Sequence, residues 1–303
     1  MQHLLQPYLI CLMLLPGVLF ANERFTVYTV NYPLQYFAER IGGEHIDVVF
    51  PAPSGVDPAF WKPGSEILRK YQKADLVLLN GAGYAKWVSK VSLPRRKQVD
   101  TSAVFASAYI QTASGPTHRH GPTGDHSHTG TASTTWLDLQ QAAQQADAVR
   151  QALSKRLPAH AADFDTNYQA LHADLMRLDL DIQRLVAGSQ DQPLFASHPV
   201  YHYLARRYEL HIRDMLWEPD SMPDDSAWEQ LRYNRERFLA NWMLWEQQPL
   251  SAIEEKLQGI GIGIVVFDPC GQRPAQGDFL KVMQRNVDNL ERIFTGRHSR
   301  VNP

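Results

Sequence analysis

The sequence is poor in cysteine, has no excess of basic charge and carries few long apolar runs. Among its 303 residues are 2 cysteines, and 30 lysines and arginines are offset by 32 aspartates and glutamates. Because there is no basic patch or stripe, neither nucleic acid nor an anionic membrane surface is an expected partner. The chain is long enough to form two domains of ordinary size.

One apolar run, residues 7–20, lies near the amino terminus. It has the length of a signal-peptide core and is too short to span a bilayer. We expect cleavage near Ala21, which would export the protein to the periplasm with no membrane span in the exported part. Cys11 would be removed with the signal, so Cys270 would have no partner for an intramolecular disulfide.

The alternation of apolar strands with amphipathic helices predicts an α/β fold in two lobes. Each lobe is expected to hold a mainly parallel sheet flanked by helices, because strands and helices alternate at the spacing of βαβ units. The first series has expected strands at 25–30, 45–50 and 75–79, separated by helices at 34–41 and 65–73. The second series has expected strands at 194–197, 210–213, 242–245 and 262–267.

One long, rigid helix is predicted between the two series. Apolar residues recur at steps of three and four from Phe164 to Leu185, as on one face of a helix. A helix over 162–187 would be a rod of about 39 Å, at 1.5 Å per residue, joining the lobes with the ligand cleft between them. The expected divisions are a signal peptide at 1–21, an amino-terminal lobe at 22–158, a linker helix at 159–188 and a carboxyl-terminal lobe at 189–303.

A histidine-rich loop at 116–130 points to metal chemistry. It contains two His-x-His pairs, His118 with His120 and His126 with His128, separated by glycine and proline. That glycine and proline content disfavours a helix or a central strand. Neutral imidazole is a preferred ligand of borderline divalent metals such as zinc. We therefore expect the loop to contact metal.

The ends of the predicted strands in the carboxyl-terminal lobe supply a second set of candidate ligands. His198, Glu246 and Asp268 each follow one of those strands. Ligands of open α/β sheets bind outside the carboxyl ends of strands, so these side chains are expected to converge. One imidazole and two carboxylates suit zinc or manganese. The alternative interpretation is that each side chain caps a helix or satisfies a turn.

At these residues the chain resembles a known family. The segment from Ser197 to Leu210 is similar to the "HxAFxYLxxxYGL" segment of solute-binding family 9, the periplasmic metal-binding proteins of ABC importers. Further similar segments follow in the same order along nearly the whole exported chain, at 28–33, 74–81, 136–138, 267–271 and 283–286. The resemblance implies two α/β lobes joined by a rigid helix, a metal in the cleft and delivery of that metal to a membrane permease.

The sequence departs from the family at two ligand positions. The family has histidine in a "DPHxxxP" segment, where this chain has Ala59, and two residues before the tryptophan of "WLD", where it has Thr134. We therefore interpret the chain as an atypical member that lacks two usual histidine ligands. Either His126 or His128 enters the cleft in their place, or the cleft site is lost or retuned and the loop chelates metal independently. Asp57 is a further oxygen donor, although aspartate before proline commonly forms turns.

The function expected from these observations is capture of a divalent metal for an ABC importer. Zn²⁺ is the first candidate and Mn²⁺ the second. The protein is expected to be a monomer, and it is not expected to be an enzyme. One alternative is a periplasmic metal buffer or chaperone that uses the histidine-rich loop without a permease. Another is a zinc-dependent hydrolase, but the sequence has no H-E-x-x-H and no G-x-S-x-G motif.

Overall fold

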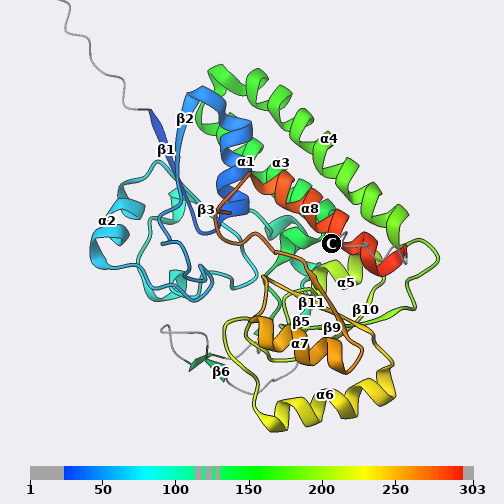
Figure 1. Cartoon of the computed structure of the whole chain (residues 1–303). Helices are drawn as coiled ribbons and strands as arrows, with labels where there is room; N and C mark the ends of the chain where they lie inside the picture. The colour runs from blue at the N-terminus through cyan, green and yellow to red at the C-terminus, as the bar shows by residue number, and fades with distance from the viewer. Residues whose placement is uncertain (1–23, 113–117, 120–124, 127–129, 296–303) are drawn as a thin grey trace, which may run out of the picture.

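The computed structural model describes residues 24–112, 118–119, 125–126 and 130–295 (Figure 1). The predicted signal peptide at 1–21 lies outside the described residues. In the part of the chain that is described, no helix is both long enough and apolar enough to cross a membrane.

The first sheet is built by the amino-terminal part of the chain. Its four strands are all parallel and lie in the order β2-β1-β3-β4. The elements are β1 (Phe25–Thr29), α1 (Tyr32–Gly42), β2 (Ile46–Val49), α2 (Ser65–Lys73), β3 (Leu76–Leu79) and β4 (Gln98–Asp100). The sequence did not predict β4, because it is short and carries no apolar run.

The second sheet repeats this plan. Its four parallel strands lie in the order β10-β9-β11-β12. The elements are β9 (Pro193–Ala196), α5 (His202–Tyr208), β10 (His211–Asp214), α6 (Asp225–Phe238), β11 (Trp242–Trp245), α7 (Ser251–Gly259) and β12 (Gly263–Val266). The prediction of an α/β fold with two mainly parallel sheets flanked by helices is confirmed, and the predicted elements end within one or two residues of the observed ones.

Three longer helices pack against one another beside the sheets. They are α3 (Leu139–Arg156), α4 (Ala161–Val186) and α8 (Phe279–Phe294). The 26-residue α4 is the predicted long helix, and its apolar face, including Phe164, Leu171 and Leu175, is fully buried. Helix α8 follows the second sheet but returns to contact α1 and α4 (Figure 1).

Short elements complete the described chain. The two-stranded sheets pair β5 (Gln111–Thr112) with β8 (Gly130–Thr131) and β6 (His118–Arg119) with β7 (Asp125–His126). The 3₁₀ helices are η1 (Gly43–His45), η2 (Val88–Lys90), η3 (Arg95–Lys97), η4 (Ala103–Ala108), η6 (Thr135–Leu137) and η7 (Pro158–His160).

Hydrogen bonds join the two halves of the molecule directly. The indole N–H of Trp136 donates to the carbonyl of Pro269 at 2.6 Å, and the backbone N–H of Tyr32 donates to the carbonyl of Gly271 at 3.0 Å. Both acceptors lie in the turn that follows β12. Because the donors come from the first half of the chain, these bonds hold the turn beside the carboxyl end of the first sheet.

Candidate metal site

His198 lies at the end of β9, in a position defined by the backbone around it. The backbone N–H of Ser197 donates to the carbonyl of Leu244 at 2.8 Å, and the carbonyl of Ser197 accepts from the N–H of Trp217, also at 2.8 Å. The residue before the imidazole is thus held from both neighbouring strands. The side chain of His198 is only 2% exposed, so the ring is fixed in a largely water-free environment.

A carboxylate that the sequence did not indicate faces this ring. The Nδ1 atom of His198 lies 3.8 Å from the Oε1 atom of Glu218, whose side chain is 16% exposed. The chain continues to pair with the sheet after β10, through the N–H of Met215 and that of Trp217. The predicted strand stopped at residue 213, so Glu218 was not counted among the residues at strand ends.

Glu246 and Asp268, both predicted ligands, line one cavity of about 390 Å³. Burial, and after it the charges of Asp57, Glu218 and Asp268, together raise the pKa of Glu246 from 4.5 to about 8. These acidic groups are therefore near enough to repel one another. A divalent cation would relieve both the burial cost and the repulsion.

Asp268 is positioned by two neighbours of its own. Its backbone N–H donates to the side chain of Asn286 at 3.0 Å, and its Oδ1 accepts from the N–H of Cys270 at 2.7 Å. Burial raises the pKa of the Asp268 carboxyl, while the Cys270 hydrogen bond and the Arg285 charge oppose that rise. Asp268 thus satisfies the turn that follows it, as the alternative to metal binding would have it, and it also lines the cavity.

The two positions where the family has histidine are occupied differently here. Ala59 is buried, and its backbone N–H donates to Oδ1 of Asp57 at 2.9 Å. Burial is the main cause of the raised pKa of both Glu246 and Tyr84, and the charge of Asp57 is the next cause of each. This carboxylate therefore lies near the same acidic group although it comes from the loop after β2. The hydroxyl of Thr134 donates to the carbonyl of Val200 at 2.5 Å.

The histidine-rich loop starts and ends beside α5. Its base is the β5–β8 pair. The hydrogen bonding continues one step beyond this pair, where the N–H of Ala132 donates to the carbonyl of Ile110 at 2.9 Å. The hydroxyl of Tyr203 donates to the carbonyl of Ala132 at 3.1 Å and accepts from the N–H of Ile110 at 3.3 Å. Tyr203 belongs to α5, five positions after His198 in the sequence.

Two of the four loop histidines have a described backbone. His118 and His126 are register partners in the antiparallel β6–β7 pair. The other two predicted ligands, His120 and His128, lie outside the described residues. The assignment of loop histidines to the cleft therefore stays a prediction.

A compact group of metal-capable donors occurs elsewhere in the molecule. Among the residues that the structure describes, the group with all three donor atoms within 4.8 Å of one another consists of His45, His160 and Asp163. Neither motif nor strand order predicted this group, because its members come from segments far apart in the sequence.

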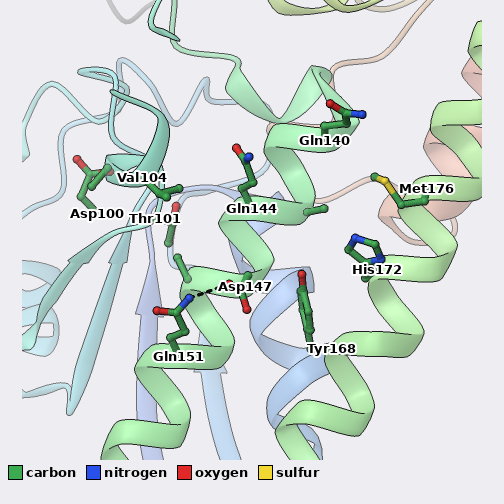
Figure 2. Close-up of a pocket in the computed structure, with 13 residues that line it drawn as sticks. Asp100, Thr101, Val104, Gln140, Gln144, Asp147, Gln151, Tyr168, His172 and Met176 are labelled. Carbon is green, nitrogen blue, oxygen red and sulfur yellow. Dashed lines mark hydrogen bonds between the residues drawn. The ribbon is translucent and has the colours of Figure 1, made fainter. Parts of the chain in front are cut away.

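The most voluminous of the described cavities is not at the predicted ligands. It measures about 530 Å³ and lies along α3 and α4 (Figure 2). Its walls combine amide and hydroxyl groups, such as those of Gln140 and Tyr168, with apolar side chains such as that of Met176. Asp147 accepts a hydrogen bond there from Gln151 at 2.7 Å. This cavity contains none of the candidate ligands at the strand ends. The smaller cavity has Glu246 and Asp268 in its lining, together with Arg285 and Arg292, while His198 is not part of that lining.

Comparison with known proteins identifies the family of the chain. The family model of the periplasmic zinc-uptake complex component A matches residues 27–293. The zinc-binding protein AdcA of Streptococcus pyogenes is 22% identical over 290 residues, which are 89% of this chain but 56% of AdcA. The chain thus spans about half the length of that relative. The metal ABC transporter substrate-binding lipoprotein SloC of Streptococcus mutans is 23% identical over 284 residues, covering 89% of this chain and 90% of SloC.

Solved structures show the same fold. The Zn(II)-bound ZnuA-like domain of Streptococcus pneumoniae AdcA superposes with a TM-score of 0.75 at 19% identity, covering 89% of this chain and 99% of that domain. FpvC of Pseudomonas aeruginosa in complex with Mn²⁺ superposes with a TM-score of 0.73 at 18% identity, covering 90% and 99%. The names of these proteins describe metal-binding and transporter components, not enzymes.

Proposed function

We propose that this chain, which belongs to the family of the periplasmic zinc-uptake complex component A, captures a divalent transition metal and delivers it to an ABC importer. Zn²⁺ is the first candidate and Mn²⁺ the second, since relatives are named for zinc binding and one neighbour was solved with Mn²⁺. Capture takes place after export, in the periplasm, and the chain acts as a monomer that docks on a membrane permease.

The observation that supports the proposal is the presence of one buried imidazole and several carboxylates at the ends of neighbouring strands. Glu246 and Asp268 line one cavity, and Glu218 faces His198 while its charge acts on Glu246. His198, Glu246 and Asp268 would bind the ion directly. Nitrogen and carboxylate oxygen donors together suit both zinc and manganese.

Two sources supply donors from the amino-terminal half. Asp57 belongs to the acidic group already, as its effect on the pKa of Glu246 indicates. The histidine-rich loop leaves the protein beside α5, and six to eight extended residues span roughly 20 Å, so His126 or His128 can reach His198. In this proposal those two histidines replace the imidazoles absent at 59 and 134, while His118 and His120 collect metal nearby.

The family match favours this function over the two alternatives. A buffer that uses only the histidine-rich loop would not require a buried His198 or a carboxylate cavity at the ends of the second sheet. A hydrolase would require a metal position open to water and substrate, whereas the relatives are substrate-binding components of transporters.

Metal titration of the stripped protein tests the proposal. We expect the wild type to bind Zn²⁺, with weaker uptake of Mn²⁺, and His198→Ala to lower the affinity of the cleft by about 100-fold or more, equivalent to about 2.7 kcal/mol. His211→Ala, which removes an exposed imidazole from β10, is the matched control and should bind as the wild type does. Equal zinc affinity in His198→Ala and in the wild type would contradict the cleft site.

A further inference from the structure

A cluster of two imidazoles and a carboxylate lies well away from the cleft. His45 ends η1, immediately before β2, while His160 ends η7 and Asp163 lies in the first turn of α4. The cleft residues follow the strands, but His45 precedes one. Helix α5, next to His198, contacts α4 near Asp179, which is roughly 24 Å along the helix from Asp163 at 1.5 Å per residue.

The three side chains are already close together. The Nε2 atom of His45 lies 2.9 Å from Oδ2 of Asp163, and the ring centroids of His45 and His160 are 3.8 Å apart at an interplanar angle of 19°. All three side chains offer a donor atom within 4.8 Å of the other two. Donors around tetrahedral zinc lie about 3.3 Å apart, given bonds of about 2.0–2.2 Å. Shifts of about 1 Å, together with rotation of one imidazole out of the stack so that its nitrogen points at the ion, would therefore bring them to coordination distance.

The surrounding structure supports the imidazoles and leaves the carboxylate accessible. Phe164 is fully buried beneath both rings, with its centroid 5.7 Å from that of His45 and 6.2 Å from that of His160. One helical turn further, the side chain of Asn167 donates to the carbonyl of Ile41 at 3.1 Å and so holds the end of α1 on α4. The side chain of Asp163 is 62% exposed, so an incoming ion can reach the carboxylate that His45 contacts.

We propose that His45, His160 and Asp163 form a second divalent-metal site, separate from the cleft and suited to Zn²⁺ or another borderline transition ion. Two imidazoles and one carboxylate supply three ligands, and water supplies the fourth. The ion replaces the proton between His45 and Asp163. It also links η1 to the start of α4, so its binding stabilises the packing of α4 on the first sheet. This proposal does not depend on the function proposed for the cleft.

The test uses the full chain with its other metal sites disabled. His198→Ala removes the cleft imidazole, and asparagine at positions 118, 120, 126 and 128 removes those of the loop. Zinc bound per chain is then measured by equilibrium dialysis and its affinity by calorimetry. We expect about one equivalent of zinc to remain bound. Adding His45→Asn and His160→Asn should lower the affinity of that equivalent by about 100-fold or more.

Two further variants make the result specific. His172→Asn with His211→Asn removes the same number of imidazoles elsewhere and should leave the remaining equivalent unchanged. Asp163→Asn keeps a hydrogen-bond acceptor for His45 but removes the charge, so it should fold normally and weaken zinc binding by about tenfold. Absence of any bound zinc in the background chain, or undiminished binding in Asp163→Asn and in the His45/His160 variant, would overturn the proposal. Loss of cleft binding through His198→Ala in the otherwise unchanged chain is a separate result and does not bear on this site.

Discussion

The Nδ1 atom of His198 faces the Oε1 atom of Glu218 at 3.8 Å, with both side chains largely shielded from solvent. In metal sites, a carboxylate beside the second nitrogen of a ligating histidine fixes the tautomer and makes the ring a better donor. This geometry leaves Nε2 of His198 as the atom for the metal. We therefore expect Glu218 to act as a positioning residue in the proposed cleft site.

Replacing that carboxylate should weaken metal binding without removing a ligand. We expect Glu218→Gln to lower zinc affinity by about 10- to 100-fold, the range found when the partner of a ligating histidine is lost. Calorimetric titration at several pH values measures the effect. Glu229→Gln, an exposed glutamate of α6, is the control and should change nothing. If both variants bind zinc as the wild type does, Glu218 does not support His198.

The raised pKa of Glu246 predicts how the stability of the metal-free protein depends on pH. The folded value is about 8 and the ordinary value is 4.5, so between these limits the folded state holds a proton that the unfolded state has lost. The free energy of unfolding should therefore fall as pH rises from about 4.5 to about 8. Asp214, whose pKa burial raises to about 7, acts in the same direction. Glu246→Gln should make the fall less steep, as measured by urea unfolding across that range, and an unchanged slope would contradict the assignment.

The same raised pKa predicts that metal binding at neutral pH releases a proton. Glu246 is mostly protonated below a pKa of about 8 in the absence of metal, and a carboxylate ligand must be ionised. Metal affinity should therefore rise with pH up to that value. Calorimetry at pH 7 in buffers of different ionisation enthalpy measures the protons released per metal. Release should drop by nearly one proton in Glu246→Gln, and equal release in both proteins would contradict a Glu246 ligand that loses a proton on binding.

Removal of the histidine-rich loop distinguishes a transport receptor from a metal buffer. Deletion of residues 116–129 keeps the β5–β8 pair, and we expect it to reduce zinc affinity by about 100-fold while His198-dependent binding persists. A buffer would lose nearly all high-affinity binding. His126→Asn with His128→Asn should reproduce most of the effect of the deletion. His118→Asn with His120→Asn is the matched control, and an equal effect of the two pairs would contradict the special role of His126 and His128.

A buried ion pair fastens α4 to the second half of the molecule. Asp179 of α4 accepts from Nε of Arg207 at 2.9 Å, from Nη2 of Arg207 at 2.5 Å and from the hydroxyl of Tyr208 at 3.0 Å. Asp179→Ala should destabilise the fold by about 3 kcal/mol, in the lower part of the range for breaking a buried pair. The loss is limited because Arg207 still has the carboxylate of Asp138 as a partner, 3.9 Å from its Nε atom. Asp181→Ala removes a partly exposed partner of Arg184 and should cost under about 1 kcal/mol. Chemical unfolding compares them, and equal losses would contradict a specific role for Asp179.

Much of the fold follows from periodicity in the sequence. The steps of three and four residues between Phe164 and Leu185 match the buried face of α4, because helical residues at that spacing share one side. The apolar run at 76–79 became β3 because a parallel strand is buried on both faces. The short, more polar β4 has neither signal, and only pairing with β3 makes it a strand.

The sequence by itself determined the two parallel sheets, the helix between them and the presence of His198, Glu246 and Asp268 at strand ends, because these depend on local patterns and on the direction of strands. The tertiary structure alone brought Glu218 to His198, Asp57 into the acidic group, and His45 to His160 and Asp163. Those contacts join segments that are distant in the chain. The positions of these residues depend on how far backbone pairing continues past the end of a strand and on how the helices pack. No local sequence pattern specifies either.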